Sequence, residues 1–234
     1  MITVSGLVKN LGDFSLNIAE LVIPGPGTYA LIGPNGSGKS TLAKIMAGLM
    51  NADNGTVDTG GLSSRDITLL SRKPYLLDDS VYNNLVYPLK LRNITPDTHL
   101  INEYLDKMGL SDRRKQKARL LSSGEQQKLA FLRALIFRPR FIIADEAMTA
   151  MDMDSLDLFE NLLLEEQKKD PIIWIIISHQ MPHIRRLTDY LFFMYNGELE
   201  TEGKVEELMT SPDNPHLRQY LRVYGAGLPE AGKG

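Results

Sequence analysis

The stretch GPNGSGKST, residues 33–41, constrains the fold of this chain more than any other feature. Its glycines let the backbone turn sharply and direct N–H groups inward. An apolar run at 28–32, TYALI, precedes the loop. Apolar residues then recur at helical spacing, at positions 42, 45, 46 and 49. A strand, a glycine loop and a helix in this order predict an α/β fold with parallel strands.

The loop matches the pattern G-x-x-x-x-G-K-[ST], which binds nucleotide phosphates. Lys39 is placed to reach the β- and γ-phosphate oxygens, and the Ser40 hydroxyl is placed to ligate Mg²⁺. The residues expected to contact nucleotide are Gly33, Pro34, Asn35, Gly36, Ser37, Gly38, Lys39, Ser40 and Thr41.

A carboxylate pair ends the buried strand FIIADE at 141–146. Asp145 is placed to hold Mg²⁺ through water, and Glu146 to accept a proton from the attacking water or to orient it. His179 follows the apolar run IIWIIIS, at the edge where ligands collect in open α/β sheets. Solvated acids and a satisfied histidine are the ordinary alternatives, and the phosphate loop upstream favours the catalytic interpretation.

The segment LSSGE, residues 121–125, predicts a helix start. Ser122 with Glu125, or Ser123 with Gln126, fits a capping box. Small residues at a helix N-terminus also suit an anion. A capped helix without a ligand and an anion site both remain possible at this point.

The chain has 234 residues, no cysteine and a net charge of −3, which exclude thiolate chemistry and a globally basic nucleic-acid-binding surface. Its apolar runs are too short to cross a bilayer, and no signal peptide is evident at the N-terminus. Residues 73–135 are mostly helical by pattern, with Thr95 as the N-cap of one helix. Asn196-Gly197 predicts a hairpin, and the basic run 113–119 is a solvated face or a docking patch.

Together these motifs resemble those of the ATP-binding cassette ATPases, over nearly the whole chain. GPNGSGKST is similar to the Walker A motif and FIIADE to Walker B with its catalytic glutamate. Asp152 falls in the D-loop, and His179 at the switch histidine. The family signature, usually LSGGQ, corresponds to Leu121, Ser122, Ser123, Gly124 and Glu125.

The resemblance implies a P-loop NTPase (RecA-like) α/β core, 1–72 and 136–225, with an N-terminal antiparallel β subdomain. A helical subdomain would span 73–135, and 226–234 would be a flexible tail. It implies ATP and Mg²⁺, the latter held by Ser40 and Asp145. It also implies a head-to-tail homodimer on ATP binding, in which each signature faces the partner's γ-phosphate.

Further partners implied are an integral membrane permease and, indirectly, an extracytoplasmic substrate-binding protein, with no nucleic acid. The chain would be a peripheral protein at the cytoplasmic face of the membrane. Two segments, 75–92 and 193–203, are most similar to importers of oxyanions such as tungstate or molybdate. The alternatives are a non-transport cassette ATPase acting on nucleic acid or ribosomes, and a regulatory nucleotide-binding protein with little turnover.

Several positions depart from the family pattern. Ser123 and Glu125 replace a glycine and a glutamine of the signature, and Ala147 replaces a proline. Leu11 falls where an aromatic residue often stacks on adenine, with Phe14 nearby as a substitute. Arg72 occupies the Q-loop glutamine position, where a guanidinium cannot ligate a metal. Arg72 would point away from the metal, reach the γ-phosphate, or lie outside the site.

Overall fold

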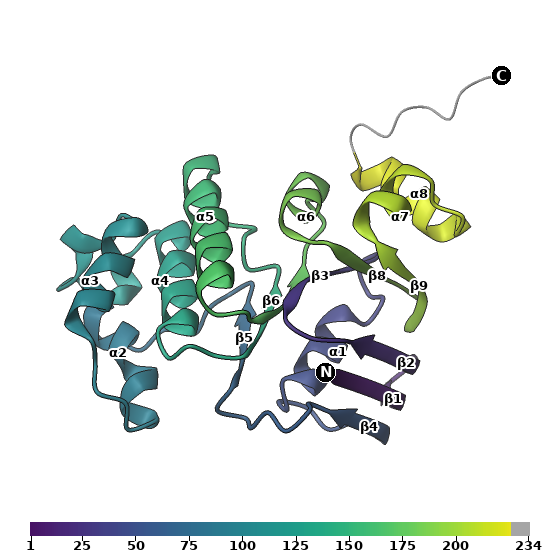
Figure 1. The fold of residues 1–234 in the computed structure, drawn as a ribbon, viewed down its shortest axis with the longest axis horizontal. Helices are drawn as coiled ribbons and strands as arrows, with labels where there is room; N and C mark the ends of the chain where they lie inside the picture. Colours follow the sequence, from purple (N-terminus) through teal and green to yellow (C-terminus); the bar gives the residue numbers. More distant parts are fainter. Residues whose placement is uncertain (226–234) are drawn as a thin grey trace. The chain divides into compact units, whose positions relative to one another are not determined.

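The computed structural model describes residues 1–225, and these form two compact units that we treat separately. Unit 1 combines Met1–Ser64 with the chain from Ile173 onward, and unit 2 is the continuous segment Arg65–Ile172. Figure 1 traces their elements. The predicted tail, 226–234, lies outside the described residues.

One sheet of unit 1 is antiparallel, with strand order β2-β1-β4. Its strands are β1 (Ile2–Leu11), β2 (Phe14–Ile23) and β4 (Asn54–Asp58). Leu16 and Ile18 of β2 are buried while their neighbours alternate outward, as expected from the period of two. This sheet confirms the expected N-terminal antiparallel β layer.

The other strands of unit 1 surround β3 (Gly27–Ile32). β7 (Ile173–Ile177) and β8 (Tyr190–Tyr195) both pair with β3 in parallel, and β9 (Glu198–Lys204) pairs with β8 in antiparallel. The predicted hairpin joins β8 to β9, with positive φ at Asn196 (46°) and Gly197 (85°). Asn17 N–H donates to the Gly197 carbonyl at 2.7 Å, which ties the hairpin tip to β2.

The helices of unit 1 are α1 (Lys39–Met46), α6 (Met181–Leu187), α7 (Val205–Thr210) and α8 (Pro215–Tyr224). The side chain of Asn214 caps α8, with Pro215 at its first position, where the missing N–H costs nothing. Leu217, Tyr220 and Leu221 give α8 a buried face.

Unit 2 is mostly helical (Figure 1). Its helices are α2 (Val81–Leu91), α3 (Thr98–Lys107), α4 (Ser123–Leu135) and α5 (Met153–Lys169), with short 3₁₀ turns η1 (Ser111–Arg113) and η2 (Ala118–Leu120). β5 (Ile67–Ser71) and β6 (Phe141–Asp145) run parallel, with Ser71 opposite Asp145. The α/β class expected from the sequence is therefore confirmed, including its inserted helices.

The N-cap of α3 is Asp97, so the prediction of Thr95 is wrong. Asp97 Oδ1 accepts from the N–H groups of His99 and Leu100 at 2.8 and 3.2 Å. Aspartate ranks above threonine as an N-cap because its carboxylate also suits the positive end of the helix dipole. Pro96 therefore precedes the helix.

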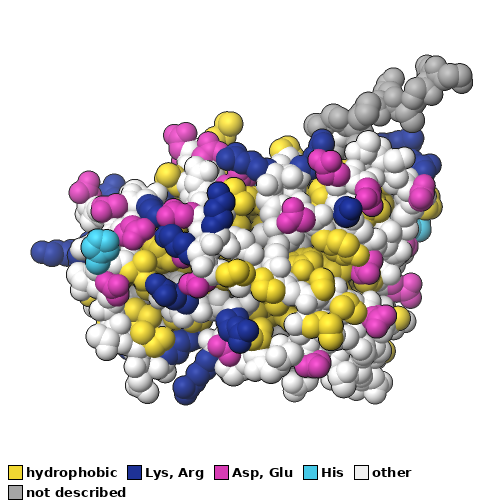
Figure 2. Space-filling view, in the orientation of Figure 1, with side chains coloured by type: hydrophobic (Ala, Val, Ile, Leu, Met, Phe, Trp, Pro, Cys, Tyr) yellow, Lys and Arg dark blue, Asp and Glu magenta, His cyan; other side chains and the backbone are white. Residues whose placement is uncertain are grey.

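Charged side chains of both signs lie on the face that Figure 2 displays, where Lys and Arg side chains are interspersed with Asp and Glu side chains. In unit 2, the basic run 113–119 includes Lys117 and Arg119, which pair with Asp78 at 3.2 and 3.3 Å. Among the described residues, none of the helices combines the length and apolar character that crossing a bilayer requires.

Candidate functional site

The phosphate loop follows β3 in unit 1 and leads directly into α1. Gly33, Gly36 and Gly38 have φ of 148°, 82° and 98°, where side chains are strained. A Cβ on Gly33 would lie 2.0 Å from the carbonyl oxygen of Met194 in β8. The loop can therefore take this path only with glycine at position 33.

Lys39 folds back over this loop. Its Nζ donates to the carbonyl oxygens of Gly33 and Pro34, each at 2.7 Å, and lies 3.3 Å from Ser37 Oγ. Ser40 is exposed in the first turn of α1. The ammonium and the hydroxyl are thus placed at a helix N-terminus, where backbone N–H groups favour an anion.

His179 lies at the same edge of the unit 1 sheet as the phosphate loop. Leu31 of β3 is paired with Ile177 of β7, so the loop and Ser178-His179 follow at the same level. His179 is exposed, and its ring meets Tyr224 edge-on with centroids 6.2 Å apart. The structure therefore brings together two segments that are far apart in the sequence.

Phe14 packs against the phosphate loop. Its Cζ lies 3.0 Å from the position that a Cβ on Gly38 would occupy. Leu11 is opposite Phe14 across the β1–β2 hairpin and is 41% exposed. Of the two candidates for stacking on a base, Phe14 is the one that contacts the loop and carries an aromatic face.

Glu146 follows β6 in unit 2 and adopts φ of 52°. This left-handed conformation costs about 1–2 kcal/mol in a residue with a side chain. The Thr149 hydroxyl lies 2.9 Å from both the carbonyl oxygen and Oε2 of Glu146 and donates to these acceptors. Sequence reasoning did not identify Thr149 as the residue that holds the glutamate.

Arg72 follows β5, one residue after the pairing of Ser71 with Asp145. The register therefore places Arg72 and Glu146 at the same edge of this strand pair. The Arg72 side chain is exposed, while its carbonyl oxygen accepts from Gln127 Nε2 at 2.8 Å. The main chain of Arg72 is thus fixed by the helix α4.

The start of α4 resolves the choice between the two predicted capping boxes. Ser122 N–H donates to Glu125 Oε2 at 2.8 Å, and Glu125 N–H donates to Ser122 Oγ at 3.2 Å. The Ser122 N–H holds the pKa of the Glu125 carboxyl below its usual range, with Arg113 3.5 Å away. Gln126 instead donates to the Leu121 carbonyl at 3.0 Å, so the Ser123–Gln126 box is not formed.

Asp152 serves as the N-cap of α5. Its Oδ1 accepts from the Ser155 N–H at 2.9 Å, and hydrogen bonding to Ser155 lowers the pKa of the Asp152 carboxyl. Two residues earlier, Ala150 N–H donates to Gln127 Oε1 at 3.3 Å. Gln127 therefore contacts both the Arg72 segment and the segment before Asp152, a role that sequence reasoning also missed.

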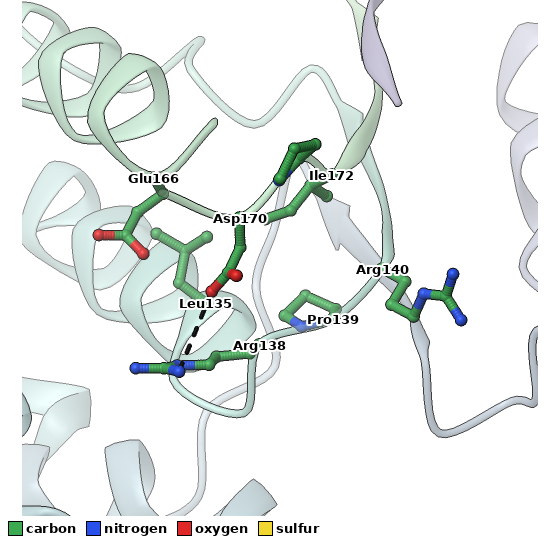
Figure 3. A pocket seen from close by; sticks show the side chains of 8 residues that line it. Leu135, Arg138, Pro139, Arg140, Glu166, Asp170 and Ile172 are labelled. Atoms are coloured by element: carbon green, nitrogen blue, oxygen red, sulfur yellow. Dashed lines mark ion pairs between the residues drawn. The ribbon is translucent and has the colours of Figure 1, made fainter. Parts of the chain in front are cut away.

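A surface hollow of about 400 Å³ lies among these segments of unit 2. Its lining comes from three segments, namely Arg72, Lys73 and Pro74, then Ser123, Gln126 and Gln127, then Thr149 and Ala150. A second hollow, shown in Figure 3, is lined by residues of 135–140 and 166–172, where Asp170 points toward Arg138 and Arg140 points away. The motif residues line only the first of these two hollows.

The family described as ABC transporter matches residues 16–149. The tungstate uptake system ATP-binding protein TupC of Peptoclostridium acidaminophilum is 34% identical over 86% of this chain and 98% of its own length. The phosphate import ATP-binding protein PstB of Saccharolobus solfataricus is 31% identical over 85% of this chain and 86% of its own length.

A methionine import ATP-binding protein, MetN 1 of Salmonella choleraesuis, is 30% identical over 89% of this chain and 65% of its own length. A solved dimer of an ATP-binding cassette, in a post-hydrolysis state with ADP and phosphate, superposes with a TM-score of 0.77. It is 24% identical and covers 88% of this chain and 99% of that chain, which shows a shared fold.

Proposed function

This chain belongs to the ABC transporter family and is an ATPase of that family, and on this premise we propose that it drives an importer of an oxyanion such as tungstate or molybdate. The likeness to a tungstate uptake protein over 98% of that protein's length supports this cargo class. Phosphate, the cargo named for another relative, is also an oxyanion. A methionine import protein is also a relative, so methionine is the competing cargo in the test below.

The chain works as a head-to-tail homodimer in this proposal. The observation that carries it is the start of α4: the capping box occupies the N–H groups of Ser122 and Glu125 and leaves those of Ser123 and Gly124 for an anion. Ser122 and Ser123 are exposed. A second copy's γ-phosphate fits a helix N-terminus of this kind.

A mixing experiment tests the shared site. Ser122→Arg places bulk and charge at the signature, and Lys39→Ala disables the phosphate loop of its own chain. Each variant alone should be nearly inactive. Mixed dimers contain one site with both changes and one site with neither, so part of the ATPase activity should return. Heterodimers that form without any activity would contradict independent composite sites.

The donor set fits Mg²⁺ held mostly by the nucleotide and water. Ser40 supplies a hydroxyl and Asp145 a carboxylate, the oxygen ligands that Mg²⁺ prefers. Among the described residues, no group of three or more His, Asp or Glu side chains could hold a metal by itself. Bound Mg²⁺ would neutralise phosphate charge. Glu146 would orient or deprotonate the attacking water, Lys39 would stabilise the γ-phosphate and His179 would contact it.

Among the positions that depart from the family pattern, Arg72 has the clearest expected effect on ATPase activity. A guanidinium has only donors, so it cannot replace the carbonyl oxygen that a glutamine offers to Mg²⁺. The exposed side chain leaves it free to point away from the metal. Arg72→Gln should therefore raise basal ATPase and strengthen its Mg²⁺ dependence. A drop of about tenfold or more would instead assign the guanidinium to the transition state, as for an arginine finger.

The permease would dock on unit 2 near Tyr75. Within the segment 75–92, we consider three side chains as permease contacts: Tyr75 is 80% exposed, whereas Leu77 and Tyr82 are half-buried. Arg114 covers the Tyr82 ring at 4.4 Å, which favours a structural role for that tyrosine. Tyr75→Ser should uncouple transport while sparing basal ATPase, and Tyr87→Ser, on α2 and 40% exposed, is the matched control.

The remaining parts of the proposal follow from a permease partner. The chain would act at the cytoplasmic face of the membrane, with an extracytoplasmic binding protein delivering cargo to the permease and no nucleic acid involved. The motor core would comprise 1–72 and 136–225, with the helical subdomain at 73–135. Reconstitution with the co-purifying membrane protein tests the cargo: tungstate or molybdate should stimulate ATPase, and stimulation by methionine alone would overturn the oxyanion assignment.

A regulatory nucleotide-binding protein with little turnover is the second candidate, favoured by Arg72 in place of the Q-loop glutamine. A phosphate-release assay separates the two. Turnover that stays near zero with Mg²⁺, ATP and the permease present would support the regulator.

A further inference from the structure

Gln127 holds two segments of unit 2 to the same helix. It lies in the second turn of α4 and is 4% exposed. Its Nε2 donates to the Arg72 carbonyl at 2.8 Å, and its Oε1 accepts from the Ala150 N–H at 3.3 Å. The segments that it joins follow the neighbouring strands β5 and β6, which carry the Arg72 position and the Asp145-Glu146 pair.

The helix approaches the D-loop closely at a second point. A Cβ on Gly124 would lie 3.2 Å from the Ala150 carbonyl oxygen. Ala150 thus approaches α4 through both its N–H and its carbonyl oxygen. Arg133, farther along α4, donates to the Tyr75 carbonyl at 2.6 Å. Side chains of one helix therefore fix the irregular segment 72–75 at both of its ends.

We propose that Gln127 is a positioning residue for ATP hydrolysis, which sets the signature, the Arg72 segment and the D-loop in one fixed relation. The inference rests on the proposed role of the signature and D-loop in the composite site. A displacement of the segment 72–75 would pass through a single amide to Ala150, two residues before Asp152. Gln127 would thus transmit a contact near Tyr75 to the D-loop.

The chemistry of the amide explains why glutamine suits this position. One end must donate to a carbonyl oxygen and the other must accept from an N–H, and the side-chain amide of glutamine offers one of each. A glutamate would keep the acceptor for Ala150 but would place an oxygen 2.8 Å from the Arg72 carbonyl. The two connections can therefore be broken separately.

The test compares Gln127→Leu, which removes both hydrogen bonds, with Gln127→Glu, which removes the one to Arg72. Gln167→Leu is the matched control. Gln167 makes the same kind of pair, donating to the Ile172 carbonyl at 3.0 Å and accepting from its N–H at 3.1 Å. Ile172 lines the hollow of Figure 3. ATPase kinetics, nucleotide binding, thermal stability and amide hydrogen exchange are measured on the full chain.

Gln127→Leu should lower kcat by about tenfold, because small displacements of catalytic segments are costly. Its affinity for ATP should stay within about twofold, since the phosphate loop belongs to unit 1. Gln167→Leu should lose stability without this loss of kcat. Exchange at the Ala150 N–H should accelerate in Gln127→Leu and remain slow in Gln127→Glu, while peptides covering 72–75 loosen in both.

Equal kcat in Gln127→Leu and Gln167→Leu at a temperature where both are folded would overturn the proposal. So would parallel losses of kcat and ATP affinity, which indicate general loss of structure. If Gln127→Leu does not fold, Gln127→Glu carries the test: parental kcat with loosened 72–75 contradicts the inference. A parental chain without ATPase activity would instead contradict the proposed function.

Discussion

The phosphate loop of unit 1 and the signature region of unit 2 are built in different ways. In the loop, backbone conformation fixes the geometry: glycines with positive φ turn the chain, and Lys39 bonds to carbonyls within six residues. In the signature region, side chains fix irregular segments across long sequence separations, 55 residues from Gln127 to Arg72 and 23 to Ala150. We therefore expect the phosphate loop to keep its conformation when distant segments of the chain move. The irregular segments of the signature region should move with them.

Glu146→Gln should give the largest loss of ATPase activity. It should also distinguish the two regions, because it changes unit 2 and leaves the phosphate loop of unit 1 intact. Loss of the proposed general base should lower ATP hydrolysis by about a thousandfold, within the range known for such groups. ATP binding should persist because the phosphate loop is untouched, and an ATP-bound dimer should accumulate. Size-exclusion chromatography with ATP and a phosphate-release assay measure both, and hydrolysis at the parental rate would remove Glu146 from the mechanism.

Gly33→Ala should impair nucleotide binding by the phosphate loop of unit 1. The new Cβ would meet the Met194 carbonyl oxygen at 2.0 Å, so the loop or β8 must shift. Nucleotide affinity should fall by about 100-fold, which corresponds to about 2.7 kcal/mol.

The control for this substitution is Gly36→Ala, where nothing lies within 4 Å and only the left-handed φ opposes the change. Its affinity should fall about tenfold or less. A fluorescent nucleotide titration compares them, and similar affinities for the two variants would show that the close approach at Gly33 is not what limits the loop.

Thr149→Val tests whether a single side chain in unit 2 holds Glu146 in its catalytic position. The substitution keeps the shape and removes the hydroxyl that bonds Glu146. We expect kcat to fall about tenfold, with unchanged ATP affinity, since the glutamate can leave its productive position. Thr149→Ser, which restores a hydroxyl, should recover most of the loss; a serine variant as slow as valine would assign the effect to packing.

Glu125→Gln should give the smallest effect and a distinctive pH dependence. The folded-state pKa of Glu125 is lowered by the Ser122 N–H, so its carboxylate stabilises the fold above its ordinary pKa of 4.5, and this contribution is lost as pH falls through the lowered value. A glutamine keeps the capping box without charge.

As the pH falls, the free energy of unfolding of the variant should therefore decrease by about 0.5–1 kcal/mol less than that of the parent. At neutral pH it should also dimerise a few-fold more tightly with ATP, because one negative charge beside the proposed anion site is gone. Asp154→Asn, an exposed acid in the first turn of α5, is the charge control. Identical acid profiles for Glu125→Gln and the parent would contradict the role of the capping carboxylate.

The features predicted from the sequence share one property, which is that their causes lie close together in the chain. The phosphate loop, the buried strands and the Asn196-Gly197 hairpin each follow from a few consecutive residues. The capping box was predicted as one of two choices, and only the geometry of Ser122 and Glu125 selected it. The N-cap of α3 was misassigned because Thr95 and Asp97 offer competing local signals.

The features that escaped prediction depend on where distant segments meet. Nothing beside Gln127 in the sequence indicates that its amide reaches Arg72 and Ala150. Thr149 is close to Glu146 in sequence. Its hydrogen bonds to Glu146 nevertheless depend on the positive φ of Glu146, which no residue pattern predicts. Candidate motifs could thus be found from the sequence, whereas the residues that hold them in place could not.

The interrupted sequence of unit 1 has a consequence for synthesis on the ribosome. β3 is flanked by β7 and β8, so the strand that leads into the phosphate loop lacks β7 until about residue 177 has been made and β8 until about residue 195. At about 5–20 residues per second, roughly 8–30 s separate the emergence of β3 from that of β8. Unit 2 is continuous, so all of it has been made once residue 172 has been added. The nascent chain would thus assemble its signature before it gains a nucleotide pocket, and ATP would bind only near the end of translation.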